Sequence, residues 1–323
     1  MFTRACPFFL LVETPLHAGS GTDLGVVDLP IQRERHTGFP KIEASGLKGS
    51  IREAFERLED HDNRQGELEK RFPNLKGDRE RYRKAISLVF GPESGDLHVG
   101  ALGFTDARLL LFPVRSARGI FAWVTCPAVL NRLCRELEMA RVSPLPPVTG
   151  AGTVPPESDL LVRAGTVVLE EYAFTVREDD EAGKLAQWLA EMTMPQEASL
   201  SWWRDRMKKG LVVLPDDDFR DLTTLATEVT TRIKIDPDTG TVQSGALFTE
   251  EYLPQESLLY GLVLASPVFG REEDREICEA VFGKEKQDEA VLKFWRTGMP
   301  KVLQVGGNAT LGKGLVRIKV WGD

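Results

Sequence analysis

The chain has 323 residues, of which 42% are hydrophobic and 28% charged, a composition typical of a globular protein with a core. Its formal net charge of -8 argues, taken alone, against nucleic acid, because such binding depends on neutralising phosphates. No apolar run approaches the ~18 residues of a membrane span, so we expect no membrane partner. The four cysteines form no CxxC pair and the four histidines lack zinc spacing, so we expect reduced thiols, no structural zinc and a cytoplasmic location.

The charge is unevenly spread along the chain. Basic side chains outnumber acidic ones in residues 71–84 and 204–209, whereas acid is concentrated in residues 178–181 and 216–218. A chain of this kind can carry a basic groove despite its acidic net charge. For each run by itself, a solvated helix face is the simpler interpretation.

In the N-terminal half, the hydrophobic pattern predicts a strand over residues 5–13 and a helix over 45–59, with Ser45 as a possible cap. Residues 60–84 are polar and contain Gly and Pro, which indicates a surface insertion. We expect a buried strand over 100–114 and a helix over 125–140, with a proline near its first turn.

The C-terminal half opens with a Pro/Gly-rich loop and then alternates strands with helices. "DPDTG" (236–240) has strong turn chemistry between two strand-like runs, which predicts a long hairpin over about 229–254. Several connections are hairpin-like, so we expect an α+β fold, an antiparallel sheet with helices on one side, of the ferredoxin-like kind. The other predicted segments are the loop 143–158, strands 166–176, 257–266 and 314–322, and helices 182–193 and 288–298.

The glycine-rich stretch "VGGNATLGKG" (305–314) invites a nucleotide-binding interpretation, because G-x-x-x-x-G-K runs from Gly307 to Lys313. The hydroxyl residue that should hold magnesium is missing, since Gly314 follows, and a strand-like run stands where a helix is required. An ATPase is therefore disfavoured. The glycines and Lys313 suit the close approach of a polyanion backbone, or simply a tight turn before the last strand.

The opening stretch "HAGSGTDLGVVDLPIQRERHTGFPKIEASGLKGSIR" (17–52) resembles the N-terminal signature of the RAMP superfamily of CRISPR proteins. The similarity is greatest to the repeated backbone subunits of the type III-B effector, the Cmr complex. Further matching segments keep their order to the end of the chain, so the resemblance covers nearly all of it. They are "LVFGPE" (88–93), "GALGFTDARLLLFPVRS" (100–116), "FTEEYLP" (248–254) and "LQVGGNATLGKGLV" (303–316).

The resemblance implies a single domain over residues 1–323, with a modified RNA-recognition-motif palm, insertions and a thumb-like β-hairpin. It implies copies stacked head to tail along a CRISPR RNA guide, together with other Cmr subunits. Each thumb would kink the guide–target duplex, and the single-stranded target RNA would be cut beside each kink with a divalent metal, Mg²⁺ or Mn²⁺. In the family an aspartate after the first strand is required for cutting, and "GVVDLPIQRE" puts it at Asp28.

One aspartate can suffice, because RNA carries its own nucleophile, the 2′-OH, which a kinked backbone can bring in line with phosphorus. A carboxylate can hold a metal ion that stabilises the developing charge or supplies a hydroxide base. Asp28 would be this ligand, with phosphate oxygens and water completing the shell, and Asp23 is a weaker second candidate. Without the resemblance, an aspartate capping a turn would be the simpler interpretation.

Three more residues are catalytic candidates. His17, at the end of the first strand, can shuttle protons, bind a phosphate or fix the glycine turn. Glu250 and Tyr252 lie at the base of the expected thumb, and in a head-to-tail stack they would join Asp28 of a neighbouring copy in a composite site. Cross-strand pairing within the hairpin is the alternative role for both residues.

RNA contacts are expected from three parts of the chain. Helix N-terminal amides favour phosphate, and such contacts read the RNA backbone, so guide–target base pairing would read sequence. Because the hairpin turn is acidic, apolar thumb residues would do the wedging. The candidates are Ser45, Lys48 and Arg52 at the start of the first helix, Gly306, Gly307 and Lys313 in the glycine-rich loop, and Ile233, Ile235 or Val242 in the thumb.

Two rival functions stay open at this point. The chain can be a catalytically inactive guide-binding scaffold, with cutting lost or done by another subunit. It can also be a different RAMP protein that processes guide precursor as a free enzyme. Asp28 favours a nuclease, and isolation as a guide-loaded complex would argue against the free enzyme.

Overall fold

β1 (Arg4–Val12) is a central strand, and its sequence explains this position. Its last seven residues are all buried, so both of its faces must be covered. It pairs antiparallel with β13 (Leu258–Ala265) on one side and with β15 (Leu315–Val320) on the other. The computed structural model describes residues 2–22, 25–60, 63–93, 98–236 and 238–322.

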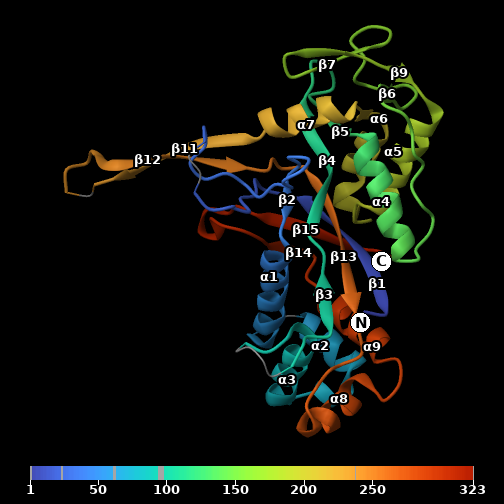
Figure 1. Ribbon diagram of the computed structural model, residues 1–323, viewed down its shortest axis with the longest axis vertical. Coiled ribbons are helices and arrows are strands. Elements are labelled where there is room, and N and C mark those ends of the chain that lie inside the picture. The colour runs from blue at the N-terminus through green and yellow to red at the C-terminus, as the bar shows by residue number, and fades with distance from the viewer. Residues whose placement is uncertain (1, 23–24, 61–62, 94–97, 237, 323) are drawn as a thin grey trace.

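The remaining strands are β2 (Lys41–Ile42), β3 (Leu102–Phe104), β4 (Ala107–Arg115), β5 (Phe121–Thr125), β6 (Thr153–Val154), β7 (Thr166–Leu169), β8 (Tyr172–Thr175), β9 (Arg177–Glu178), β10 (Leu211–Val213), β11 (Glu228–Ile235), β12 (Val242–Tyr252) and β14 (Val302–Gln304). Within the described residues, the main sheet has 11 strands, in the order β14-β15-β1-β13-β4-β5-β10-β6-β9, with β2 beside β4 and β3 beside β13. Figure 1 shows this sheet along the middle of the molecule.

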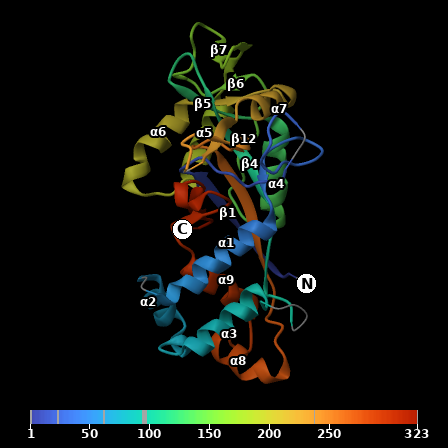
Figure 2. The same cartoon turned by 90° about the vertical axis from the view of Figure 1, so that its left-hand side faces the viewer.

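The helices are α1 (Ala44–Glu56), α2 (Asn63–Arg71), α3 (Arg79–Phe90), α4 (Pro127–Met139), α5 (Asp180–Met192), α6 (Ser201–Lys209), α7 (Asp216–Leu225), α8 (Arg275–Phe282) and α9 (Gln287–Gly298). Short 3₁₀ helices lie at η1 (Arg57–Asp60), η2 (Pro73–Leu75), η3 (Ala198–Leu200), η4 (Glu272–Asp274) and η5 (Ala309–Leu311). In Figures 1 and 2, α1, α2, α3, α8 and α9 gather toward one end of the long axis, and α5, α6 and α7 toward the other. Among the described residues, no helix is long and apolar enough to cross a membrane.

The sheet is mixed, which corrects the expectation of an antiparallel one. β10 runs parallel to β5, and β9 runs parallel to β6, while the other neighbours in the sheet are antiparallel. Parallel neighbours need a long crossover, and α4 lies in the connection from β5 to β10. The sequence pattern showed the helix but not the pairing that it makes possible.

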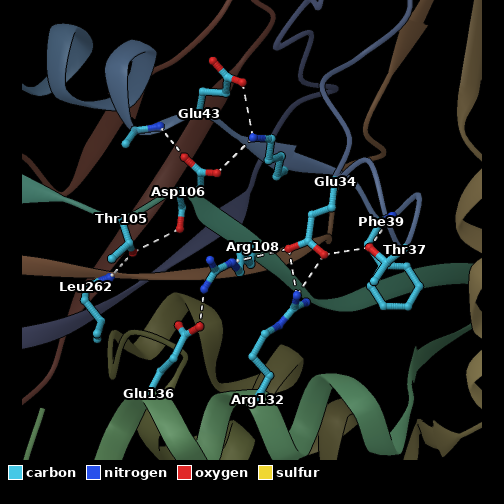
Figure 3. Close-up of polar contacts among 12 residues, drawn as sticks. Glu34, Thr37, Phe39, Glu43, Thr105, Asp106, Arg108, Arg132, Glu136 and Leu262 are labelled. Atoms are coloured by element: carbon cyan, nitrogen blue, oxygen red, sulfur yellow. Dashed lines mark hydrogen bonds and ion pairs between the residues drawn. The ribbon is translucent and has the colours of Figure 1, made fainter. Parts of the chain in front are cut away.

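Helices cover both faces of the sheet, which corrects the expectation of helices on one side. Phe8 of β1 packs its ring against Trp295 of α9, with ring centroids 6.1 Å apart. Phe9, the next residue of β1, pairs with Tyr260 of β13, which in turn pairs with Arg108 of β4, so the three side chains share one face of the sheet. On that face Arg108 forms an ion pair with Glu136 of α4 (Figure 3). Neighbouring strand residues point to opposite faces, so α9 and α4 lie on opposite sides.

The start of α1 is capped by a distant residue and not by Ser45. The helix begins at Ala44, with Glu43 at the N-cap and no side-chain cap from that residue. The Ala44 amide donates to the Asp106 carboxylate over 2.9 Å, so a loop between β3 and β4 supplies the acceptor. Ser45 therefore lies exposed inside the first turn, and the regular helix ends at Glu56, three residues before the predicted end.

The segment expected as a surface insertion, 60–84, contains α2, η2 and the beginning of α3. Its few apolar side chains are buried, including Leu68, Phe72, Leu75 and Tyr82. The Phe72 ring lies 5.5 Å from that of Phe294 on α9. The segment is therefore packed against the core through its apolar residues, although most of its sequence is polar.

Two predicted strands are interrupted by turns. Residues 166–176 form the hairpin β7–β8, because the chain reverses at Glu170, which has a φ of 49°. Residues 100–114 divide into β3, which pairs with β13, and β4. Chain reversal at a non-glycine residue leaves no strong signal in the sequence.

The hairpin β11–β12 forms a separate two-stranded sheet that projects from the body of the molecule (Figure 1). Its register runs from Glu228 opposite Tyr252 to Ile233 opposite Leu247, with an irregularity before Ile235 pairs with Val242. Pro237, in the turn, lies outside the described residues. The base of this hairpin, at residues 249–252 of β12, joins the body beside the first loop of the chain.

Candidate functional site

The base of the hairpin brings the N-terminal loop against β12. The Leu29 amide donates to the Thr249 carbonyl over 3.0 Å, and the Glu251 amide donates to the Leu29 carbonyl over 3.0 Å. Side chains alternate between the two faces of an extended strand. Thr249 and Glu251 therefore face one side of β12, and Glu250 and Tyr252 face the other.

Asp28 lies on the Thr249 side of the strand and is exposed. Its Oδ2 accepts hydrogen bonds from the Thr249 amide (2.7 Å) and the Thr249 hydroxyl (2.8 Å), and its own amide donates to Thr249 Oγ1 (3.0 Å). The backbone bond and then the hydroxyl bond hold the pKa of Asp28 below its ordinary value. Within the part of the chain that the structure describes, no Lys or Arg forms an ion pair with it, so Asp28 is an oriented, ionised carboxylate open to a ligand.

Glu251, on the same face, fastens the loop that carries Asp28. Its Oε1 accepts from the Arg33 guanidinium (2.5 Å) and the Thr227 hydroxyl (2.8 Å), and its Oε2 accepts from the Ile31 amide (3.0 Å). A loop tied to a strand by charge-assisted bonds is held firmly in register. The position of Asp28 is therefore set by Thr249 and Glu251, which lie on the same face of β12.

Glu250 and Tyr252 form a buried polar network on the opposite face of β12. Glu250 Oε2 accepts from Arg232 Nε (2.6 Å) and the Tyr252 hydroxyl (2.6 Å), and its Oε1 accepts from the Asn308 amide nitrogen (2.6 Å). Arg232 and Asn308 also donate to the Tyr252 hydroxyl. Burial favours a higher pKa for Glu250, but the bonds from Tyr252, Asn308 and Arg232 outweigh it and lower that pKa. The network favours the structural role of cross-strand pairing for both residues.

His17 joins this network from the first part of the loop that follows β1. Its Nδ1 lies 2.7 Å from the Glu251 carbonyl oxygen, an acceptor, so Nδ1 carries the proton. Its Nε2 lies 3.7 Å from Glu250 Oε1, and its ring lies edge-on to Tyr252 with centroids 5.7 Å apart. His17 is thus held by the hairpin base, on the face away from Asp28.

The glycine-rich loop closes over His17. The Gly307 amide donates to the His17 carbonyl over 2.9 Å, and a Cβ at Gly306 would lie 2.3 Å from the same oxygen. Gly306 has a φ of 80°, so both space and backbone conformation require glycine there. The Lys313 ammonium lies 5.0 Å from the centre of the Tyr252 ring. β15 follows this loop in place of a helix, which agrees with rejecting the ATPase interpretation.

The predicted contacts on α1 are partly engaged within the chain. Lys48 is half-buried, and its ammonium donates to the Leu102 carbonyl over 3.1 Å. Arg52 donates to Glu56 (2.6 Å) and to the Gly91 carbonyl (2.9 Å). Burial and then the charge of Arg52 lower the pKa of Lys48. Ser45 is exposed, so its hydroxyl is open to a ligand, whereas the Ala44 amide already donates to Asp106.

A metal ion would find only a sparse set of protein ligands here. Among the described residues, no group of three or more His, Cys, Asp and Glu side chains could hold one. Mg²⁺ commonly binds through one or two carboxylates and keeps several waters or substrate phosphates. Asp28 fits that pattern as a single protein ligand. Asp23, the second carboxylate candidate, lies outside the described residues.

The structure gathers most of the predicted site residues but divides them between two faces. His17, Glu250, Tyr252, Gly306, Gly307 and Lys313 lie together on one side of β12, and Asp28 lies on the other. Sequence reasoning missed Thr249, Arg232 and Asn308. The alternation of side chains along "FTEEYLP" indicates that Thr249 faces away from Glu250, so the sequence alone predicts that they lie on opposite faces of the strand. Nothing local indicates that Asn308 reaches Glu250.

The family model of the RAMP superfamily matches residues 9–317, and the chain belongs to this superfamily. It is 38% identical over 315 residues to the CRISPR system Cmr endoribonuclease Cmr4 of Pyrococcus furiosus, covering 96% of this chain and 93% of that one. It is 26% identical over 341 residues to the CRISPR system CMR subunit Cmr4 of Saccharolobus solfataricus, covering 100% of this chain and 98% of that one.

Solved structures resemble the chain over nearly its full length. The crystal structure of oligomeric Cmr4 from Pyrococcus furiosus has a TM-score of 0.63 at 30% identity, covering 99% of this chain and 98% of that one. The type III-B Cmr-beta complex bound to cognate target RNA contains a chain with a TM-score of 0.66 at 20% identity, over 99% and 98% of the two chains. The second similarity concerns the fold.

Proposed function

We propose that this chain is the repeated backbone subunit of a type III-B CRISPR effector complex, binding the CRISPR RNA guide and cutting complementary target RNA at regular intervals. The observation that carries the proposal is Asp28, an exposed carboxylate oriented by Thr249 at the base of a projecting hairpin. It occurs in a chain 38% identical to a protein named as a Cmr endoribonuclease.

The topology supports a palm of the RNA-recognition-motif type within one domain over residues 1–323. Along the chain, β1, α1, β4, β13, α9 and β15 follow a β-α-β-β-α-β order. In the sheet these strands stand as β15-β1-β13-β4, each antiparallel to its neighbour. This is the ferredoxin-like arrangement, to which the further strands and helices are additions. The hairpin β11–β12 would be the thumb.

The hairpin carries the side chains expected to wedge between bases. Ile233, Ile235 and Val242 are about half exposed, and Leu247 is more so. Exposed apolar side chains on a projecting element are typical of a binding surface. We propose that they contact stacked bases, and that guide phosphates meet Ser45, Lys48 and Arg52 on α1 and Gly306, Gly307 and Lys313 in the glycine-rich loop. Copies stacked head to tail, with other Cmr subunits, would repeat these contacts along the guide in the cytoplasm.

The chemistry assigned to Asp28 requires little from the protein. The RNA supplies the 2′-OH, and the thumb would hold the kinked backbone so that this oxygen lies in line with the scissile phosphorus. Asp28 would hold Mg²⁺ or Mn²⁺, which when bound stabilises negative charge on the phosphate. The Thr249 bonds keep the carboxylate ionised and pointed at its ligand. Glu250 and Tyr252 are buried on the other face of β12, with the partly buried His17 beside them. A composite site that joins these residues to Asp28 of a neighbouring copy is part of the proposal.

The test is target-RNA cleavage by the reconstituted guide-loaded complex, comparing wild type with Asp28→Ala in magnesium, manganese and chelator. We expect cutting to fall by about 100-fold or more while target binding is unchanged, as for loss of a catalytic group. Asp217→Ala, at an exposed carboxylate of α7, is the matched control. Unchanged cutting by Asp28→Ala would make the chain a guide-binding scaffold, the alternative function. Equal cutting in chelator would show that the reaction needs no divalent metal.

A further inference from the structure

We propose that Thr249 is a positioning residue for Asp28, so that the thumb strand itself sets the orientation of the cutting carboxylate. This inference rests on the proposed role of Asp28. Thr249 is one residue from the buried network and belongs to the hairpin, whereas Asp28 belongs to the N-terminal loop. The two residues are 221 positions apart in the sequence.

The contact between these residues is close and reciprocal. Two donors of Thr249, its amide and its hydroxyl, converge on one oxygen, Asp28 Oδ2, at 2.7 and 2.8 Å. The hydroxyl oxygen also accepts from the Asp28 amide at 3.0 Å. An exposed aspartate otherwise samples several rotamers, and each convergent bond narrows that range. Thr249 therefore leaves Asp28 with one favoured orientation before RNA arrives.

Thr249 can orient Asp28 because the next two residues of β12 are fixed by side-chain contacts, one on each face of the strand. Glu250, the next residue, is locked by Arg232 and Asn308 on one face. Glu251, one further along, is locked by Arg33 on the other. A reacting group needs supporting residues that are themselves fixed, because small displacements cost much rate. Any shift of the hairpin base would move the amide and hydroxyl that hold Asp28, so thumb position and cutting geometry are coupled.

The hydroxyl of Thr249 allows its positioning role to be tested apart from the backbone contacts of β12. The Thr249 amide belongs to the backbone and survives any substitution other than proline, whereas the hydroxyl is specific to the side chain. Thr249→Val removes the hydroxyl and keeps the β-branched shape, and Thr249→Ser keeps the hydroxyl. Thr231 lies directly opposite Thr249 in the hairpin register, and Thr231→Val makes the same chemical change beside it.

The experiment measures single-turnover target cleavage, guide loading and target binding in the reconstituted complex. We expect Thr249→Val to cut roughly tenfold more slowly, the scale of one lost charge-assisted hydrogen bond. Thr249→Ser should stay within about threefold of wild type, because the hydroxyl returns without its methyl group. Thr231→Val should cut at the wild-type rate, and guide loading and target binding should be unchanged in all three.

A double-mutant cycle separates positioning from a merely structural role. In an Asp28→Asn background, Thr249→Val should cause no additional loss, because a positioning residue acts through the group that it positions.

The outcomes distinguish this inference from the proposed function. If Asp28→Ala still cuts, the catalytic proposal fails, and positioning by Thr249 fails with it. If Asp28→Ala is inactive while Thr249→Val cuts like wild type, positioning alone is overturned. Equal losses in Thr249→Val and Thr231→Val would assign the effect to the hairpin in general and would also overturn it.

Discussion

Two carboxylates on opposite faces of β12 show how differently one strand can use an acidic group. Asp28 is exposed, and its Oδ2 accepts two hydrogen bonds from Thr249. Glu250 is 4% exposed, and both of its oxygens accept bonds from side chains that also bind one another. Both carboxyls have lowered pKa values, so ionisation does not separate them.

The partners of each carboxylate separate the two roles. A buried charge is tolerable only when its hydrogen bonds are satisfied, and Glu250 meets this condition with Arg232, Tyr252 and Asn308. Its remaining capacity for a substrate is small. Within the described residues, Asp28 is stabilised by neutral donors, which orient the carboxylate without compensating its charge. Asp28 and Glu250 therefore differ in compensation of charge, not in the direction of their pKa shifts.

The largest effect on stability is expected from Glu250→Gln. The substitution removes the charge that pairs with Arg232 and leaves buried donors facing an amide, which should lower the free energy of unfolding by about 3 kcal/mol. Asp28→Asn, the matched change on the other face, should leave the free energy of unfolding nearly unchanged, because this side chain is exposed. Chemical denaturation of the isolated chain measures both. Similar losses in the two variants would break the distinction between the faces.

Glu256 extends the comparison to a half-buried carboxylate that lies near a like charge. Burial, and then the charge of Glu13, raise the pKa of Glu256 from 4.5 to about 7. The folded state thus holds a proton that the unfolded state releases, so this group lowers stability as pH rises from 4.5 toward 7. Allowing for partial exposure, Glu256→Gln should be roughly 2 kcal/mol more stable than wild type above this window.

The measurement for Glu256 is the difference in unfolding free energy between variant and wild type across pH 4 to 8. That difference should vanish at the acid end, because Glu256 is then protonated in both states. Glu171→Gln, at an exposed carboxylate, provides the control. A stability gain that is constant with pH would show that protonation of Glu256 is not its cause.

A smaller loss of stability than in Glu250→Gln is expected from Tyr252→Phe, which sharpens the description of the buried face. The hydroxyl donates to Glu250, but Arg232 and Asn308 each keep a bond to that carboxylate when it is removed. We expect a loss of about 1 kcal/mol in the free energy of unfolding, with cutting by the folded complex unchanged. A large loss of cutting with normal stability would instead support Tyr252 as a catalytic residue.

The sequence by itself was enough for the features that depend on near neighbours. The apolar run of β1, the turn chemistry of "DPDTG" and the periodicity of α4, α5 and α9 led to elements in the right places, because strand and helix patterns repeat within a few residues. Its motifs also indicated the family and pointed to Asp28. The strict alternation along 249–252 already separated Glu250 from Thr249.

Only the tertiary structure decided which distant groups meet. Thr249 reaches Asp28 across 221 positions, Asn308 reaches Glu250 across 58, and Asp106 caps α1 across 62. The parallel pairing of β10 with β5 and the cover of both sheet faces depend likewise on long connections. Such contacts form when the whole chain buries its apolar surface, and no local pattern encodes them, so a residue's partners, and with them its role, are settled by the fold.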